Sequence, residues 1–150
     1  MIVTCALPPD ENEIVSLLRE KHSEDGIGPF SEAKTRAVVQ QGLARDRAMI
    51  GVIRSTAIEA TVGLYVTGSF DSDFEFLSDL WLHVKKDRRR SDHAKELIGF
   101  CRWAADSLGR PLIMARFSVP GITDQLVALY GRRLGKPAGS VFRYDPATAA

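Results

Sequence analysis

The chain has 150 residues, a hydrophobic content of 45%, a charged content of 26% and a net charge of +1 at pH 7. This length suits a single domain over residues 1–150, and a chain of this size buries about 70% of the surface that it exposes when unfolded. The near-neutral charge argues against a nucleic-acid or membrane partner, and no apolar run approaches the ~20 residues of a membrane span. With no signal-peptide pattern at its start, we expect a cytoplasmic globular protein.

The N-terminal segment is expected to form a strand over residues 2–6 and then a helix. Asp10 and Glu13 have the spacing of a capping box, in which two side chains bind free N–H groups at a helix start. Apolar residues three or four positions apart define the inner helix face, formed by Ile14, Leu17 and Leu18. A polar loop over residues 21–29 is expected to follow this helix.

A second helix and a hairpin are expected next. Ser31 is a residue type typical of a helix N-cap, and Gly42 fits a C-terminal stop after about Gln41. Runs rich in β-branched and apolar residues predict two strands over residues 49–54 and 58–66, joined by a short turn.

A long strand over residues 74–84 leads through a basic turn, residues 85–90, into the central helix. The strand is longer than average, so we expect it to contain a bulge. Ser91 is the expected N-cap of the helix, which ends at Gly109 with Pro111 just beyond.

The C-terminal third is expected to add a strand over residues 112–117, a helix from Thr123 to about Gly135 and a strand over residues 141–144. The first of these strands follows a strand and a helix, so it is expected to pair in parallel through a right-handed crossover. The resulting order, β-α-α-β-β-β-α-β-α-β, predicts an α+β fold with a mixed sheet.

Few residues in the sequence have the chemistry of a disulfide framework or a metal site. Cys5 and Cys101 fall in a predicted strand and a predicted helix, where reduced, buried thiols are expected. The three histidines are scattered along the chain. We therefore expect no bound metal.

The junction between the long strand and the central helix is a candidate anion site. A helix start presents free backbone N–H groups and a positive dipole end. Basic side chains surround it, namely Lys85, Lys86, Arg88, Arg89, Arg90 and Lys95. A phosphate ligand is favoured here over a solvated surface turn or a nucleic-acid patch.

Residues 89–94, with the sequence R-R-S-D-H-A, resemble the [Q/R]-x-x-G-x-[G/A] motif of the GNAT superfamily of N-acetyltransferases. The family places this motif between a strand and a helix and grips the pyrophosphate of acetyl-CoA there. Arg89 and Ala94 match its ends, whereas Asp92 stands where the family usually has Gly. The element order resembles the GNAT fold over nearly the whole chain, and the short motif looks like that of phage and prophage acetyltransferases.

The resemblance implies acetyl-CoA as the acetyl donor. In the family, the backbone at the end of the long strand binds the pantetheine arm, and one N–H there polarises the thioester carbonyl. The turn and helix start hold the phosphates. The expected cofactor-binding residues are Leu82, His83, Val84, Arg89, Arg90, Ser91, Asp92, His93, Ala94 and Lys95.

Two catalytic residues are predicted, Tyr130 and Asp79. Tyr130 lies in a stretch similar to the family's L-Y-x-x-x-G, whose tyrosine protonates the departing thiolate; a core tyrosine is the alternative. The base is chosen from Glu75, Asp79 and His83 on the long strand. In a regular strand Asp79, Trp81 and His83 alternate onto one face, which a bulge would change.

The expected reaction transfers an acetyl group from acetyl-CoA to a primary amine of a small molecule or peptide, by direct attack in a ternary complex. In the family, the loop between the first two helices, here residues 22–30, and the C-terminal segment, here residues 136–140, set acceptor specificity. An inactive acyl-CoA-binding module is one alternative, and a nucleic-acid-binding protein using the basic turn is another. The sequence leaves a homodimer open.

Overall fold

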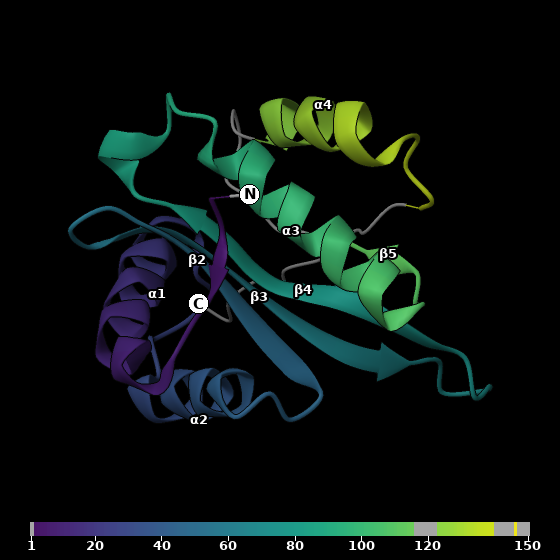
Figure 1. Cartoon of the computed structure of the whole chain (residues 1–150), viewed down its shortest axis with the longest axis horizontal. Coiled ribbons are helices and arrows are strands. Elements are labelled where there is room, and N and C mark those ends of the chain that lie inside the picture. Colours follow the sequence, from purple (N-terminus) through teal and green to yellow (C-terminus); the bar gives the residue numbers. More distant parts are fainter. Residues whose placement is uncertain (1, 116–122, 140–145, 147–150) are drawn as a thin grey trace.

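The computed structural model describes residues 2–115, 123–139 and 146. Its helices are α1 (Glu11–Asp25), α2 (Glu32–Leu43), α3 (His93–Leu108) and α4 (Thr123–Leu134). Figure 1 shows a sheet between two helical layers, with α1 and α2 on one face and α3 and α4 on the other. The helices begin and end close to the predicted positions, so the order of elements in this part of the chain is confirmed.

The described residues form a five-stranded sheet in which the strands lie in chain order. The strands are β1 (Thr4–Cys5), β2 (Ala48–Arg54), β3 (Ile58–Gly68), β4 (Glu75–Val84) and β5 (Leu112–Ile113). The first four pair in antiparallel fashion, and β4 and β5 pair in parallel. This mixed sheet confirms the predicted α+β class. The predicted strand over residues 141–144 lies outside the described residues.

Two apolar cores fill the spaces between the sheet and its helices. Period-two alternation along the strands supplies both, since Val52 packs toward α1 and α2 while the next residue, Ile53, packs toward α3. Phe100 is the largest fully buried side chain of the α3 core. The predicted inner face of α1 is confirmed, because Ile14, Leu17 and Leu18 are buried in the other core.

The start of α1 differs from the predicted capping box. The Asp10 carboxylate accepts a hydrogen bond from the Leu7 N–H at 2.9 Å and pairs with Arg54 at 2.6 Å, while Glu13 accepts one from the Ile58 N–H at 2.6 Å. Both acids bind residues of other segments instead of the free N–H groups at the start of α1, so the predicted capping box was wrong. Burial alone would raise the pKa of Asp10, but these partners lower it on balance.

Two other boundaries also differ from the prediction. The expected loop begins only after Asp25, because Lys21 pairs with Asp25 at 2.7 Å one helical turn away and extends α1. Gly42 does not stop α2 but lies buried inside it. A Cβ atom at Gly42 would lie 2.6 Å from Cγ1 of Ile50, so this glycine allows the helix to approach the sheet closely.

The predicted bulge in the long strand is present. Gly63 pairs with Trp81 and the next β3 residue, Leu64, pairs with Asp79, so Leu80 is the extra residue. The bulge also reverses the side-chain alternation, since Leu77 packs beneath α3 and Trp81 beneath α1 and α2. The regular alternation of the predicted strand therefore does not hold across Leu80.

Candidate active site

Strands β4 and β5 pair only briefly. The register joins Leu77 to Leu112 and Ser78 to Ile113, and no further pairing of the two strands is found in the described residues. Beyond it, an Asp79 carboxylate oxygen accepts a hydrogen bond from the Ala115 N–H at 3.0 Å. A side-chain hydrogen bond thus replaces the next backbone hydrogen bond between the strands, and the two parallel strands separate at the bulge.

The remaining part of β4 leads directly to the start of α3. Leu82, His83 and Val84 are buried and pair with β3. A short 3₁₀ turn, η2 (Lys86–Arg88), follows. The predicted strand-turn-helix junction is therefore confirmed, with the strand end and the helix start close together in the chain.

The helix start has its N-cap one residue later than predicted. Asp92, not Ser91, occupies the N-cap position, and its side chain makes no capping hydrogen bond. The Ser91 hydroxyl instead donates to the Arg88 carbonyl at 2.6 Å and accepts from the His93 N–H at 3.3 Å. Within the described part of the chain, the N–H groups of Ala94 and Lys95 have no hydrogen-bond acceptor.

Carboxylates hold two arginines of the basic turn. Arg89 donates to the Val84 carbonyl at 3.3 Å and pairs with Glu24 of α1. Arg88 lies 3.3 Å from Glu59, whose carboxylate also binds His93 at 2.8 Å. The pKa of Glu59 is lowered first by a hydrogen bond from Ser55 and then by the one from His93. These ion pairs fix the turn to α1 and β3.

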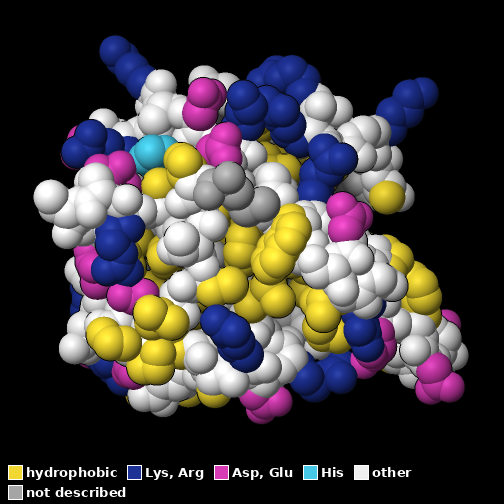
Figure 2. All heavy atoms as spheres, viewed as in Figure 1, with side chains coloured by type: hydrophobic (Ala, Val, Ile, Leu, Met, Phe, Trp, Pro, Cys, Tyr) yellow, Lys and Arg dark blue, Asp and Glu magenta, His cyan; other side chains and the backbone are white. Residues whose placement is uncertain are grey.

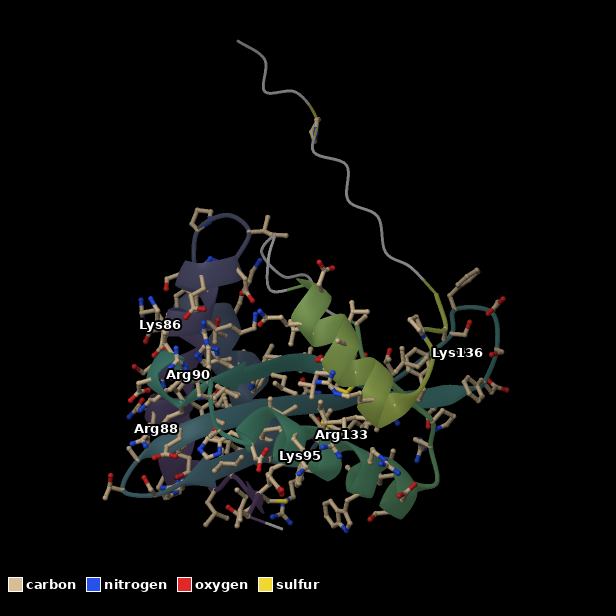
Figure 3. All side chains as sticks on the ribbon, turned by 90° about the horizontal axis from the view of Figure 1, so that it is seen from above. Lys86, Arg88, Arg90, Lys95, Arg133 and Lys136 are labelled. Atoms are coloured by element: carbon tan, nitrogen blue, oxygen red, sulfur yellow. The ribbon has the colours of Figure 1, made fainter. Side chains whose placement is uncertain are left out.

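The other cations near this junction are exposed. Figure 2 shows Lys and Arg side chains along the upper part of the molecule, where Figure 1 places α4 and the start of α3. Figure 3 shows Lys86 and Arg90 at the turn, Lys95 on α3 and Arg133 on α4. Helices α3 and α4 contact each other. The basic surface therefore extends from the turn along α3 toward α4.

Of the two predicted catalytic residues, Asp79 lies at the separation of β4 and β5, and Tyr130 lies on α4. Asp79 is 9% exposed, and it contributes with burial to a raised pKa of about 12 for Cys101 in the α3 core, burial being the larger cause. Tyr130 is half-buried on α4 and packs on the same core, together with Met114 just after β5. Both residues thus lie next to the α3 core, Asp79 through its charge near Cys101 and Tyr130 through packing.

The other two candidate bases have structural partners elsewhere. Glu75 pairs with Arg110 and Arg47, whose hydrogen bonds lower its pKa. His83 is 5% exposed and lies 3.4 Å from Glu20 of α1. Burial lowers the pKa of His83 more than this carboxylate raises it. Of the three candidates, Asp79 is the one that lines the groove described next.

A groove of about 490 Å³ leads from the α1–α2 loop to the separation of the strands. The predicted specificity loop forms one wall, where His22 binds the Gly28 carbonyl at 2.9 Å and packs edge-on against Phe30. Asp79 was predicted as a site residue, whereas Leu80 at the bulge and the residues on α2 were missed, since no local pattern marks a wall built by distant elements. The lining is Leu18, Lys21, His22, Asp25, Gly26, Ile27, Phe30, Lys34, Thr35, Val38, Asp79, Leu80, Trp81 and Ala115.

Neither a metal site nor a membrane span is found in the part of the chain that the structure describes. No three His, Cys, Asp or Glu side chains there are grouped to hold a metal ion. None of the described helices combines the length and apolarity needed to cross a bilayer.

The architecture is that of the GNAT-like acyl-CoA N-acyltransferases, as many solved acetyltransferase structures show. A predicted acetyltransferase from Clostridium acetobutylicum, solved with acetyl-CoA, is 10% identical, with a TM-score of 0.76 over 95% of this chain and 94% of that one. An aminoglycoside 6′-N-acetyltransferase from Acinetobacter haemolyticus is 14% identical, with a TM-score of 0.72 over 99% and 100%.

A ribosomal-protein-alanine N-acetyltransferase from Brucella melitensis is 16% identical, with a TM-score of 0.69 over 97% of this chain and 99% of that one. No family model and no curated protein matches the sequence. At these identities the comparisons establish the fold, and the chemistry has to be argued from the site.

Proposed function

We propose that this protein is an N-acetyltransferase that transfers the acetyl group of acetyl-CoA to a primary amine in a ternary complex. The observation that carries the proposal is the separation of β4 and β5 at Asp79 and Leu80. This separation adjoins the start of α3 through the end of β4, and it also meets the groove. A donor and an acceptor can therefore meet there from opposite sides.

The helix start fits the phosphates of coenzyme A. The free N–H groups of Ala94 and Lys95 can bind phosphate oxygens at the positive end of the helix dipole. The exposed Arg90 and Lys95 side chains add charge-assisted contacts. Arg89 and His93 would contribute indirectly, because their ion pairs with Glu24 and Glu59 hold the turn and the helix start in place. The cradle is thus mainly backbone, supported by two exposed cations.

The end of β4 is suited to the pantetheine arm. Leu82, His83 and Val84 pair with β3 on one edge, and among the described residues no strand pairs with their other edge. When bound, acetyl-CoA supplies an activated thioester. An N–H donor on this edge would stabilise negative charge on the carbonyl oxygen during attack.

Asp79 and Tyr130 would move the two protons of the reaction. Asp79 lines the groove and would draw the acceptor ammonium to the strand separation and take up its proton, directly or through water. Tyr130 would give its hydroxyl proton to the departing thiolate. Holding both reactants in the separation supplies proximity, which contributes much of the acceleration.

The first test is thermal unfolding with acetyl-CoA, with ATP and duplex DNA as controls. A ligand at a hundred times its dissociation constant stabilises a protein by about 2.7 kcal/mol, which raises the Tm of a domain of this size by roughly 5–10 °C. Acetyl-CoA and coenzyme A alone should produce the shift. A shift with DNA alone would favour the nucleic-acid alternative, and no shift would refute the proposal.

The second test is release of coenzyme A thiol in the presence of amines. We expect Tyr130→Phe to lower kcat by about 10²–10⁴-fold, the usual contribution of a general acid, with acetyl-CoA affinity unchanged. Binding without turnover on any amine would identify a non-catalytic acyl-CoA module. The cytoplasmic location, a homodimer and the likeness to phage-encoded acetyltransferases stay predictions from the sequence.

A further inference from the structure

One carboxylate joins the segments that surround the proposed phosphate site. Glu59 lies near the start of β3, and its side chain is only 11% exposed. Its Oε1 accepts from the Ser55 hydroxyl at 2.6 Å and lies 3.3 Å from the Arg88 guanidinium. Its Oε2 lies 2.8 Å from Nε2 of His93. Both carboxylate oxygens are therefore used within the protein.

These contacts come from three parts of the chain. Ser55 belongs to the turn between β2 and β3, Arg88 to the 3₁₀ turn η2, and His93 is the first residue of α3. The Glu59 backbone carbonyl adds a fourth contact, because it accepts from the Lys85 N–H at 2.9 Å, just after the end of β4. Glu59 thus holds both ends of the basic turn to the sheet.

The contact with His93 bears on the proposed phosphate cradle. His93 directly precedes Ala94 and Lys95, whose backbone N–H groups form that cradle. Hydrogen bonds weaken steeply when their angle falls, so these donors have to be held in one orientation. The N-cap residue Asp92 makes no capping hydrogen bond, and the half-buried His93 imidazole is bound to Glu59 instead. This pair therefore anchors the first turn of α3 from the side.

We infer that Glu59 is a positioning residue for the acyl-CoA donor and acts through His93, an inference that rests on the proposed function and adds a residue to its donor site. Hydrogen bonds from Ser55 and His93 lower the pKa of Glu59, so it is a carboxylate at neutral pH. Its negative charge opposes a phosphate ligand nearby. Removal of the charge alone would tighten donor binding, whereas loss of the anchor weakens it, so the direction of the change separates the two effects.

The test is coenzyme A binding by Glu59→Gln, measured by titration calorimetry without an amine. The change keeps the shape of the side chain, but an amide nitrogen cannot accept the hydrogen bonds that a carboxylate oxygen accepts. The Kd should rise about tenfold, as expected for the loss of a charge-assisted hydrogen bond. In turnover, the KM for acetyl-CoA should rise with it, while kcat and the KM for the amine stay unchanged. An unchanged or lower Kd would overturn the inference.

Glu13→Gln is the matched control. Glu13 lies on α1 and accepts from the N–H of Ile58 at 2.6 Å, so it is a carboxylate bound to the residue next to Glu59 on β3. This variant should bind coenzyme A with the Kd of the wild type. An equal rise in Kd in both variants would assign the effect to the start of β3 in general and would overturn the role of Glu59.

His93→Phe tests the route through the helix start, and it carries the test alone if Glu59→Gln does not fold. Phe keeps a ring at this position and has no nitrogen to bind Glu59. The Kd should rise about tenfold, and the double variant should show no further rise, because both changes break the same contact. A rise of about a hundredfold in the double variant, the product of two independent effects, would overturn the route.

The outcomes also separate this inference from the proposed function. If the Kd for coenzyme A changes as expected and no amine is acetylated, the inference stands and the proposed function fails. If the wild type acetylates amines and Glu59→Gln binds coenzyme A like the wild type, the inference fails and the proposed function stands.

Discussion

Gly63→Ala tests whether the bulge and the groove depend on close contact between β3 and the Trp81 indole. A Cβ atom at Gly63 would lie 2.5 Å from Cη2 and 2.6 Å from Cζ2 of Trp81. Ordinary carbon contacts are about 3.5–4.0 Å, so the ring has to move by about 1 Å. The ring is 6% exposed and its Nε1 donates to Thr61 at 3.3 Å, so packing and this bond both resist the movement.

Overpacking of this kind costs about 1–3 kcal/mol, which lowers the Tm of a domain of this size by roughly 2–10 °C. We expect this loss in thermal unfolding, together with a higher KM for the acceptor amine and little change in the KM for acetyl-CoA. Gly99→Ala is the matched control. Its Cβ would meet nothing within 4 Å on an exposed part of α3, so it should raise stability by up to about 1 kcal/mol. A Gly63→Ala protein as stable as the wild type would refute the reasoning.

Two further predictions concern titratable groups. The pKa of Asp10 is lowered in the folded state. The Asp10 carboxylate therefore contributes to stability above its unfolded-state pKa of about 3.9, and this contribution is lost as the pH falls through the folded-state pKa. Asp10→Asn should weaken this dependence of stability on acid pH, as measured by urea unfolding at a series of pH values. Cys101 is fully buried with a pKa raised to about 12, so a thiol reagent at pH 8 should label the half-buried Cys5 first and Cys101 only at the rate of unfolding. Equal labelling of both thiols in native protein would contradict this.

Much of the fold could be predicted because its signals are local. The helical spacing of Ile14, Leu17 and Leu18 gave the inner face of α1, and Gly109, at φ 60°, ended α3 as expected for a residue that tolerates a left-handed conformation. The length of β4 predicted its bulge. Each of these features depends on residues within one element.

The features that the sequence did not predict correctly depend on contacts between distant parts of the chain. Gly42 has the residue type of a helix stop, yet Ile50 on the next strand requires a glycine inside the helix. Arg89 matches a phosphate-binding position, and its partner Glu24 lies 65 residues earlier. The position of Leu80 within the bulge decided which side Trp81 faces. None of these partners is visible in a local pattern.

Asp92 is the largest departure from the motif, and its place at the helix start leads to a final prediction. The residue holds the N-cap position, its side chain is exposed, and it makes no capping hydrogen bond. Its carboxylate therefore adds negative charge next to the free N–H groups of Ala94 and Lys95 while supplying no capping contact.

Asp92→Asn removes this charge and keeps a good N-cap residue. Exposed charge pairs are worth about 0.2–1 kcal/mol, so acetyl-CoA should bind about 1.5- to 5-fold more tightly, with the gain falling as salt screens the charge. Titration of the thermal shift at two ionic strengths measures both effects. Weaker binding by the Asp92→Asn variant would show that the carboxylate takes part in holding the donor, and the backbone cradle proposed above would then be incomplete.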